Sequence, residues 1–264
     1  MFLKCLTLLL GCALLCEGRV PQVDQRIIGG FPLTIETVPW QVYLKMKVTN
    51  DFGEDRYKSC GGVIYKKDII LTAAHCIVNI TTDDISVYFG SAKNASGELV
   101  KVSKAISHED YNGVHYSYAY DIAVLVLSSP IPLGVNASTI EIADETPEAG
   151  TAALTTGWGD KDANDTDSSS NTLLGTFVTI QDLHSCRVLY YIADYFITDS
   201  MICVNNFGRG VCNGDSGGPL VNSNGELIGL ASWNLDCDKE YVPDMYTNVV
   251  AFKDWIQSAA NIIV

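Results

Sequence analysis

Short apolar or alternating runs, separated by turn-forming residues, recur along almost the whole chain. Most are about four to eight residues long and rich in β-branched side chains, which is typical of β-strands. Successive strands without intervening helices favour a β-sandwich or β-barrels. The sequence therefore predicts an all-β protein whose strands lie in residues 38–46, 61–65, 68–74, 85–90, 121–127, 151–158, 175–180, 218–222, 226–233 and 245–250.

Helical periodicity is clear only at the C-terminus, where apolar side chains fall on one face at helical spacing. These side chains are Phe252, Trp255, Ile256, Ala259 and Ile263. A shorter helix is predicted over residues 181–191, and the acidic, Ser-rich segment 160–171 is predicted to be an exposed loop. The 264 residues suffice for one large domain or two small ones with a sizeable core.

The first 18 residues predict a secretory signal peptide. One lysine precedes an apolar stretch from Cys5 to Cys16, and small residues follow. The stretch is too short to span a bilayer of about 30 Å, and no later stretch is apolar enough to support the alternative of a membrane anchor. We therefore expect a secreted, extracellular protein with no membrane partner.

Six cysteines remain after the signal peptide: Cys60, Cys76, Cys186, Cys203, Cys212 and Cys237. An even number of cysteines in an oxidising compartment predicts three disulfides, although these residues alone do not choose the pairing. Zinc binding is the competing interpretation, and no CxxC or HxxxH spacing supports it.

The chain is strongly acidic, with a formal net charge of −14. A negative surface argues against binding to nucleic acid or anionic membranes. Four Asn-x-Ser/Thr sequons fit passage through a glycosylating pathway, and we expect two or three of them to carry glycans. The sequons begin at Asn79, Asn94, Asn136 and Asn164.

The stretch GVCNGDSGGPL (210–220) places Ser216 among glycines, directly after an acid. A surface turn is the simplest interpretation. The alternative is a nucleophile in a cradle of backbone N–H groups, which requires a histidine and a carboxylate elsewhere. GDSGG also matches the G-x-S-x-G elbow of α/β-hydrolases, but in that fold the catalytic histidine follows the serine. All four histidines precede Ser216 here, which excludes the elbow and leaves the order His, Asp, Ser.

Two residues suit the missing roles. His75 ends the apolar stretch LTAAHC next to a cysteine, so a strand and a disulfide would hold its ring in place as a general base. Asp121 precedes six apolar residues, where a carboxylate is tolerated only if it is hydrogen-bonded. A strand-edge cap is the alternative for Asp121. The other histidines are interpreted as surface or structural residues: His108, His115 and His184.

The motifs LTAAHC, DIAVL and GDSGGP resemble those of the chymotrypsin/trypsin-like serine proteases. Further matches, among them IIGG (27–30), PWQV (39–42), GWG (157–159), SW (232–233) and DWI (254–256), extend over nearly everything after residue 26. The resemblance implies two packed six-stranded antiparallel β-barrels with a C-terminal helix. Their boundaries would be about 27–141 and about 142–264. It also implies the disulfides Cys60–Cys76, Cys186–Cys203 and Cys212–Cys237.

The same resemblance implies a mechanism. Ser216 would be the nucleophile, His75 the general base and Asp121 the residue that orients and stabilises the imidazole. The backbone N–H groups of Gly214 and Ser216 would form the oxyanion hole. Ser232, Trp233 and Asn234 would form the strand that pairs with the substrate backbone.

An activation site is implied at Arg26, which precedes IIGG. A trypsin-like protease would cleave there, remove a propeptide of residues 19–26 and free the amine of Ile27. In this family the new amine pairs with the acid before the nucleophile, here Asp215, and orders the substrate pocket. We therefore expect an inactive precursor.

The substrate pocket departs from that of trypsins. Gly210 stands at its base, where trypsins have aspartate, while Asp244 takes a position that is glycine in many relatives. This exchange resembles the brachyurin-type collagenolytic proteases, so we expect cleavage after Arg or Lys with tolerance for apolar residues. Asn234 replaces a glycine expected at the pocket mouth, which would partly exclude large side chains.

Ser91 stands near the expected first carboxylate of the trypsin calcium loop, so we predict no metal and no cofactor. Protein or peptide substrates and protein protease inhibitors are the expected partners of a monomer. Two other functions remain to be weighed. A catalytically silent homologue acting as a binding or regulatory module commonly loses a triad residue, and all three are present here. An esterase is disfavoured by the histidine order.

Overall fold

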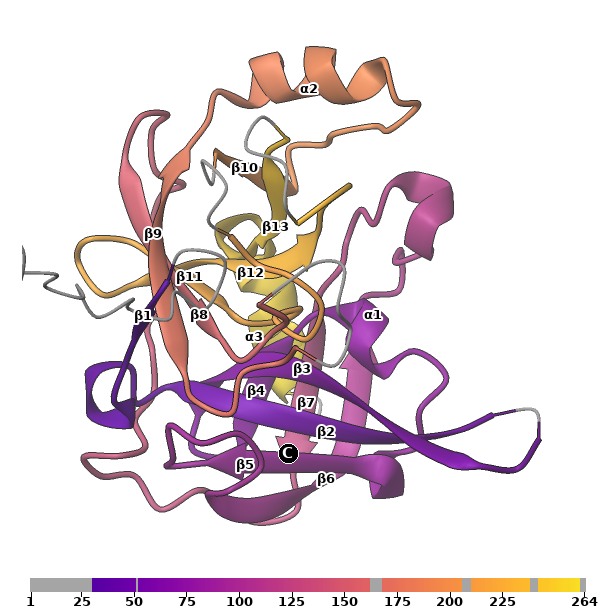
Figure 1. The fold of residues 1–264 in the computed structure, drawn as a ribbon, viewed down its shortest axis with the longest axis vertical. Coiled ribbons are helices and arrows are strands. Elements are labelled where there is room, and N and C mark those ends of the chain that lie inside the picture. The colour runs from indigo at the N-terminus through magenta and orange to yellow at the C-terminus, as the bar shows by residue number, and fades with distance from the viewer. Residues whose placement is uncertain (1–29, 51, 162–167, 206–209, 238–241, 262–264) are drawn as a thin grey trace, which may run out of the picture.

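The computed structural model describes residues 30–50, 52–161, 168–205, 210–237 and 242–261, which form two β-barrels and three α-helices (Figure 1). The first barrel lies in the lower half of Figure 1 and closes in the order β2-β3-β4-β7-β6-β5, with every pairing antiparallel. Its strands are β2 (Gln41–Thr49), β3 (Asp55–Lys66), β4 (Ile69–Thr72), β5 (Ile85–Phe89), β6 (Glu98–Ser107) and β7 (Ala123–Leu127).

The second barrel is a six-stranded antiparallel ring in the order β9-β10-β13-β12-β11-β8, which the β8–β9 pairing closes. A short strand β1 (Phe31–Pro32) adds to the outside of β9. The ring strands are β8 (Ala152–Gly157), β9 (Leu174–Ile180), β10 (Met201–Asn205), β11 (Pro219–Val221), β12 (Leu227–Trp233) and β13 (Asp244–Asn248). The predicted fold of two six-stranded barrels is therefore confirmed.

Both predicted helices are present, and a short helix α1 (Ala74–Ile77) carries His75. Helix α2 (Leu183–Tyr191) begins after Asp182, whose carboxylate accepts a hydrogen bond from Ser185 N. Helix α3 (Lys253–Asn261) follows a 3₁₀ turn, η4 (Val249–Phe252). Three further 3₁₀ turns are η1 (Ile35–Thr37), η2 (Thr82–Asp84) and η3 (Gly113–Tyr116). Within the described residues, no helix is long and apolar enough to cross a membrane.

Besides the two-residue strand β1, two strands were not among the predicted runs. Strand β6 mixes lysine and serine with apolar residues, and only Val100 and Val102 on it are buried. Strand β10 is a short run that pairs between β9 and β13. Both strands complete a ring, so their neighbours stabilise them more than their own residue pattern does.

One apolar cluster joins the two barrels. Val63, Leu71 and Val124 of the first barrel pack there with residues of β12 and with Ile256 of α3. The described residues contain three disulfides, Cys60–Cys76, Cys186–Cys203 and Cys212–Cys237, the pairing that the resemblance implies. These disulfides fit an extracellular protein.

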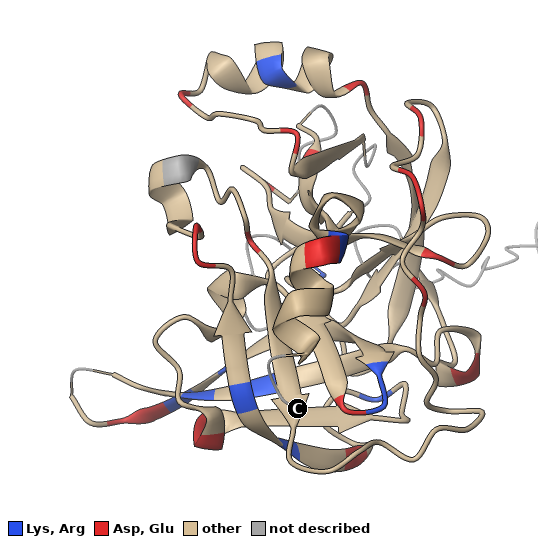
Figure 2. Cartoon of the chain, turned by 180° about the vertical axis from the view of Figure 1, so that it is seen from behind, with Lys and Arg blue, Asp and Glu red and all other residues tan. Residues whose placement is uncertain are grey.

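The acidic residues are spread over both barrels and occupy many of the loops, as Figure 2 shows from behind. The basic residues are distributed less evenly. Residues 30–141 contain nine Lys and Arg against twelve Asp and Glu, whereas residues 142–264 contain five against seventeen. The negative charge of the chain is therefore concentrated in its second half.

Candidate active site

Ser216 lies in a turn between Cys212 and β11, which we call the nucleophile turn (213–218). Two of its glycines have positive φ, 93° at Gly214 and 77° at Gly217, a region that other residues rarely adopt. A Cβ on Gly217 would also lie 2.2 Å from Thr72 Oγ1. The density of glycine around Ser216 therefore follows from the backbone conformation and from the close approach of the first barrel.

Backbone contacts seat the nucleophile turn on β3. Gly61 N donates a hydrogen bond to Ser216 O at 2.8 Å, and Gly61 O accepts one from Thr72 Oγ1 at 2.8 Å. A Cβ on Gly61 would lie only 2.8 Å from Gly218 Cα, so the two backbones touch. The position of Ser216 relative to the first barrel is therefore fixed without intervening side chains.

His75 and Asp121 are joined by two hydrogen bonds. Asp121 Oδ1 accepts from His75 N at 2.8 Å, and His75 Nδ1 lies 2.7 Å from Asp121 Oδ2. The same Oδ2 accepts from Ser232 Oγ at 2.6 Å, and Asp121 is 0% exposed. The carboxylate therefore fixes both the position and the tautomer of the imidazole, with Nδ1 protonated and Nε2 free to accept a proton.

The Cys60–Cys76 disulfide lies beside both His75 and the nucleophile turn. Cys76 Sγ is 3.9 Å from His75 Nε2 and 3.7 Å from Ser216 O, so Nε2 faces the turn that carries Ser216. No hydrogen bond between Ser216 Oγ and His75 Nε2 is formed within the described residues. Such bonds are often long before substrate binds and tighten in the complex.

Two backbone N–H groups beside Ser216 are available to a substrate. Asp215 N, Gly217 N and Gly218 N donate to carbonyl groups of this chain. Gly214 N and Ser216 N donate to no acceptor among the described residues. Two N–H groups that have no acceptor among the described residues, one on the candidate nucleophile and one two residues before it, match the requirement for an oxyanion hole.

Asp215 is buried behind the nucleophile turn. Its Oδ1 accepts from Gly159 N at 2.7 Å and its Oδ2 from Cys212 N at 3.0 Å. Burial raises the pKa of Asp215 to about 7, although these two hydrogen bonds oppose the rise. No cation of the described residues pairs with it. Its carboxyl therefore occupies a site that would be stabilised by a positively charged partner.

The two glycines of GWG, whose role the sequence alone does not reveal, lie against Asp215. A Cβ on Gly157 would lie 2.0 Å from Asp215 Oδ1, and one on Gly159 would lie 2.3 Å from Oδ2. Both glycines therefore make the space that the buried carboxyl occupies. The motif itself was the available signal, but its contact with residue 215 is visible only in the folded chain.

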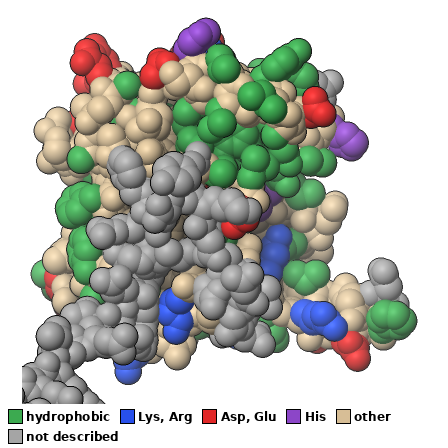
Figure 3. Space-filling model, turned by 45° about the horizontal axis from the view of Figure 1, so that its top comes forward, with side chains coloured by type: hydrophobic (Ala, Val, Ile, Leu, Met, Phe, Trp, Pro, Cys, Tyr) green, Lys and Arg blue, Asp and Glu red, His purple; other side chains and the backbone are tan. Residues whose placement is uncertain are grey.

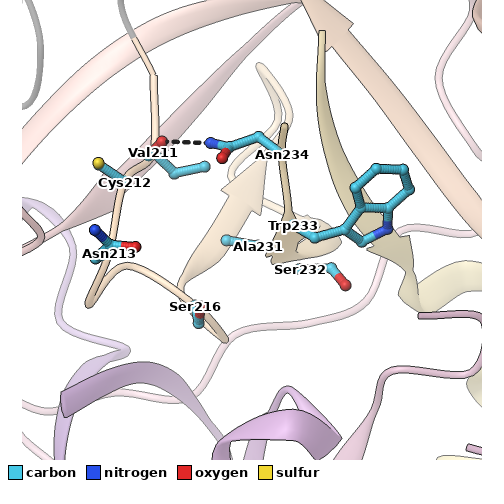
Figure 4. Close-up of a pocket in the computed structure, with 8 residues that line it drawn as sticks. All are labelled: Val211, Cys212, Asn213, Ser216, Ala231, Ser232, Trp233 and Asn234. Carbon is cyan, nitrogen blue, oxygen red and sulfur yellow. Dashed lines mark hydrogen bonds between the residues drawn. The ribbon is translucent and has the colours of Figure 1, made fainter. Parts of the chain in front are cut away.

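A cavity of about 150 Å³ runs from Ser216 along β12 (Figure 4). Asn234 lies at its far side and donates from Nδ2 to Val211 O at 2.9 Å and to Asp244 Oδ1 at 3.2 Å. The lining residues are Val211, Cys212, Asn213, Ser216, Ala231, Ser232, Trp233 and Asn234. Gly210 and Asp244 are buried next to this lining and are not part of it. Asp244 contacts the lining only indirectly, by accepting the hydrogen bond from Asn234.

Trp233 is held in an aromatic stack that the sequence analysis did not identify. Its ring stacks on Tyr195 with centroids 5.1 Å apart and on Tyr118 with centroids 6.0 Å apart. Tyr118 also meets His75 edge-on at 6.3 Å. Trp233 lines the cavity, and the stack packs this ring against the loop before Asp121 and the loop after α2. No sequence pattern joins these three distant segments.

The other histidines occupy surface or structural positions. His108 is buried and stacks on Trp255 with ring centroids 4.8 Å apart, whereas His115 and His184 are exposed. Among the sequons, Asn79 and Asn136 are exposed, and Asn94 donates from Nδ2 to Ser170 O at 3.1 Å. Arg26, Ile27 and Asn164 lie outside the described residues.

One group of potential metal ligands is found in the described part of the chain. Atoms of Cys60, His75 and Cys76 lie within 4.8 Å of one another. The two sulfur atoms form a disulfide and so cannot act as thiolate ligands. The group is therefore part of the active-site scaffold.

Comparisons with known proteins identify relatives over almost the whole chain. Residues 27–256 match the family model described as Trypsin. The chain is 37% identical over 248 residues to "Trypsin alpha" of Drosophila melanogaster, covering 94% of this chain and 92% of that protein. It is 36% identical over 262 residues to "Trypsin alpha-4" of Lucilia cuprina, covering 95% and 96% of the two chains.

A solved structure is also similar. The scabies mite inactivated protease paralogue S-D1 superposes with a TM-score of 0.77 at 27% identity, covering 88% of this chain and 98% of that chain. The family match, the relatives and the shared architecture agree. The chain therefore belongs to the trypsin family of chymotrypsin-like serine proteases.

Proposed function

We propose that this chain is a serine endopeptidase that hydrolyses peptide bonds through an acyl-enzyme. The observation that carries the proposal is the double attachment of Asp121 to the backbone and ring of His75, beside the turn of Ser216. Ser216 Oγ attacks the carbonyl carbon while His75 Nε2 takes its proton. The imidazolium then protonates the leaving amine as the C–N bond breaks. Water hydrolyses the ester by the same route.

The oxyanion formed in each step would accept hydrogen bonds from Gly214 N and Ser216 N. Their availability in the described residues supports this role. Removing one donor of such a pair typically raises the barrier by about 3 to 4 kcal/mol. Asp121 would stay ionised and stabilise the imidazolium while the negative charge develops on the substrate.

The chain is further proposed to be made as an inactive precursor, with propeptide 19–26 following signal peptide 1–18. A trypsin-like protease would cleave after Arg26, and the ammonium of Ile27 would pair with Asp215. The buried carboxyl of Asp215, with its raised pKa, supports this step because it lacks a cation among the described residues. Cleavage would therefore give the carboxyl of Asp215 a positively charged partner, the ammonium of Ile27, and would order the nucleophile turn.

Labelling with an organophosphonate tests both proposals. The form that begins at Ile27 should gain one phosphonyl group on the peptide containing Ser216, as measured by mass spectrometry after digestion. A Ser216→Ala variant of this form is the matched control and should gain none. An uncleavable Arg26→Ala precursor should react far more slowly. If the Ile27 form does not react, the chain is a silent homologue, and if the precursor reacts equally fast, the activation step is wrong.

Substrate preference is proposed to be Arg or Lys before the scissile bond, with tolerance for apolar residues, in a brachyurin-like pocket of Gly210 and Asp244. The hydrogen bond between Asp244 and Asn234 in the cavity wall supports an influence of this carboxylate on the pocket. We expect Asp244→Asn to reduce the Arg-to-Leu ratio of kcat/KM by about tenfold, because a charge contact in a partly buried site contributes about 1.4 kcal/mol or more.

The measurement is kcat/KM on two peptides that differ only in the residue before the scissile bond. Glu145→Gln, which removes an exposed carboxylate from a loop outside the cavity, serves as the control and should leave the ratio unchanged. An unchanged ratio in Asp244→Asn would contradict the assignment.

Trypsin-like proteases act on protein substrates and are regulated by protein inhibitors, and the same partners are proposed here. Secretion is proposed from the predicted signal peptide and from the disulfides. Asn79 and Asn136 are the proposed glycan acceptors, because both are exposed, whereas the amide of Asn94 is engaged with Ser170 O.

A further inference from the structure

A second cavity, of about 450 Å³, opens on the other side of the nucleophile turn. Strands β2 and β3 supply Lys45, Tyr57 and Lys58 to its lining, and the nucleophile turn supplies Asn213 and Gly214. Gly214 is the residue proposed to hold the oxyanion. The cavity therefore begins at the reacting centre and extends along the β2–β3 hairpin.

The two cavities meet at Asn213, which lines both. The first runs along β12, where the substrate segment before the scissile bond would pair with Ser232 to Asn234. Because the scissile carbonyl sits at Ser216, between the two cavities, the segment after the scissile bond must leave in the other direction. The second cavity lies in that direction.

Two lysines of this cavity have no carboxylate partner among the described residues. Lys58 Nζ donates to His75 O at 3.2 Å, and Lys45 Nζ lies 4.3 Å from the centroid of the Tyr57 ring. Farther along the same hairpin, by contrast, Lys47 pairs with Asp55 at 2.8 Å. Among the described residues of this hairpin, the two lysines that line the cavity therefore lack an acid partner, whereas Lys47, farther along, has one.

One carboxylate also lines the cavity. It belongs to Asp160, which is buried and accepts a hydrogen bond from Asn213 Nδ2 at 3.2 Å. Burial lowers the pKa of Lys58, which means that its ammonium is held in an environment that disfavours its charge. An arriving carboxylate would offset that desolvation, so the gain on binding is larger than for an exposed lysine.

The location of these lysines contrasts with the acidic character of the chain. On the face shown in Figure 3, the Lys and Arg side chains lie in the lower half, and hydrophobic side chains gather in the upper half. The first cavity is lined by no charged residue, whereas the second is lined by two lysines and one carboxylate, so the net charge of the lining is positive only after the scissile bond.

We propose that Lys45 and Lys58 form a subsite that selects Asp or Glu in the first few residues after the scissile bond. The inference rests on the proposed endopeptidase function and specifies its substrates. It concerns the substrate residues after the scissile bond, which do not occupy the first cavity.

The test uses the activated form and matched fluorogenic peptides that share every residue up to the scissile bond. The residue at the bond is the one most often selected in a library digest. One peptide continues with two glutamates and the other with two glutamines. We expect kcat/KM to be about fivefold higher for the glutamate peptide at low salt, the scale of about 1 kcal/mol for a favourable charge contact. The ratio should fall as salt screens the contact.

Variants locate the effect. Lys45→Gln with Lys58→Gln should bring the ratio close to one, and Lys45→Gln alone should lower it. Lys45 is included singly because its ammonium has no carboxylate partner among the described residues and lies over the Tyr57 ring, so this variant guards against a folding defect. Lys104→Gln on β6 removes an exposed lysine outside the cavity and should retain the ratio.

An amide substrate with a chromogenic leaving group tests the endopeptidase function separately from the lysine subsite, because it has no residues after the scissile bond. If this substrate is not hydrolysed, the endopeptidase function fails. If it is hydrolysed but the glutamate and glutamine peptides are cleaved equally, the proposed selection of acidic residues by Lys45 and Lys58 is overturned. A ratio that persists in the lysine variants overturns it as well.

Discussion

Replacing Asp121 with asparagine should lower kcat by roughly 10⁴-fold, the loss known for this change in the general Ser-His-Asp template. Asp121 Oδ2 accepts hydrogen bonds from both His75 Nδ1 and Ser232 Oγ, and Oδ1 accepts one from His75 N. An asparagine NH₂ cannot accept, so an asparagine whose Oδ1 keeps the hydrogen bond from His75 N turns its NH₂ donor toward His75 Nδ1 and Ser232 Oγ. The imidazole then carries its proton on Nε2 and cannot take one from Ser216.

The measurement is kcat of the activated Asp121→Asn variant on a peptide substrate, with the urea unfolding midpoint as a check on the fold. Ser232→Ala is the matched control, because it removes one hydrogen bond from the same oxygen without introducing a donor. Its loss of kcat should be far smaller. A loss below tenfold in Asp121→Asn would show that Asp121 does not set the tautomer.

The uncleaved precursor should become less stable as the pH rises from about 4 to about 7, and Asp215→Asn should remove much of that dependence. The pKa of Asp215 is raised to about 7 in the folded chain, from an ordinary value of 3.8. Between these values the folded chain holds a proton that the unfolded chain has released. The free energy of unfolding therefore falls with pH in this window, by an amount on the order of 4 kcal/mol.

Urea unfolding midpoints of the Arg26→Ala precursor, with and without Asp215→Asn, measure this effect at pH 4.5, 6 and 8. The variant should gain stability relative to its parent as the pH rises, since an amide has no charge to desolvate. For Glu145→Gln, at an exposed position, the difference in unfolding midpoint between variant and parent should not change with pH. In the form cleaved at Arg26, the ammonium of Ile27 should pair with Asp215. The Asp215→Asn variant of that form should then be no more stable than its parent at higher pH. A parallel pH dependence in both precursors would refute the raised pKa.

The strand pattern predicted an all-β protein, and the resemblance carried by the three motifs predicted two barrels and singled out His75, Asp121 and Ser216 as candidates. Each of these residues stands in a local context that signals its chemistry, such as a carboxylate directly before a buried strand. The sequence was less informative for β6, because a barrel strand with one face in solvent tolerates lysine and serine. Its position depends on β5 and β7.

Features made by distant segments were not predicted. Gly157 and Gly159 make room for Asp215, and Lys58 reaches the carbonyl of His75, yet neither relation leaves a periodic or spaced pattern. The aromatic stack on Trp233 likewise depends on loops that follow separate elements. Local propensity indicates which residues form strands, whereas these contacts follow from how the two barrels meet.

The touching backbones of Gly61 and Gly218 have an evolutionary consequence. Because main-chain atoms set the spacing between β3 and the turn that carries Ser216, changes in the surrounding loops leave that spacing intact. The β2–β3 hairpin and the segment after α2 are thus free to diverge. Substitutions or insertions there can change the surface around Ser216, while its position against β3 is retained.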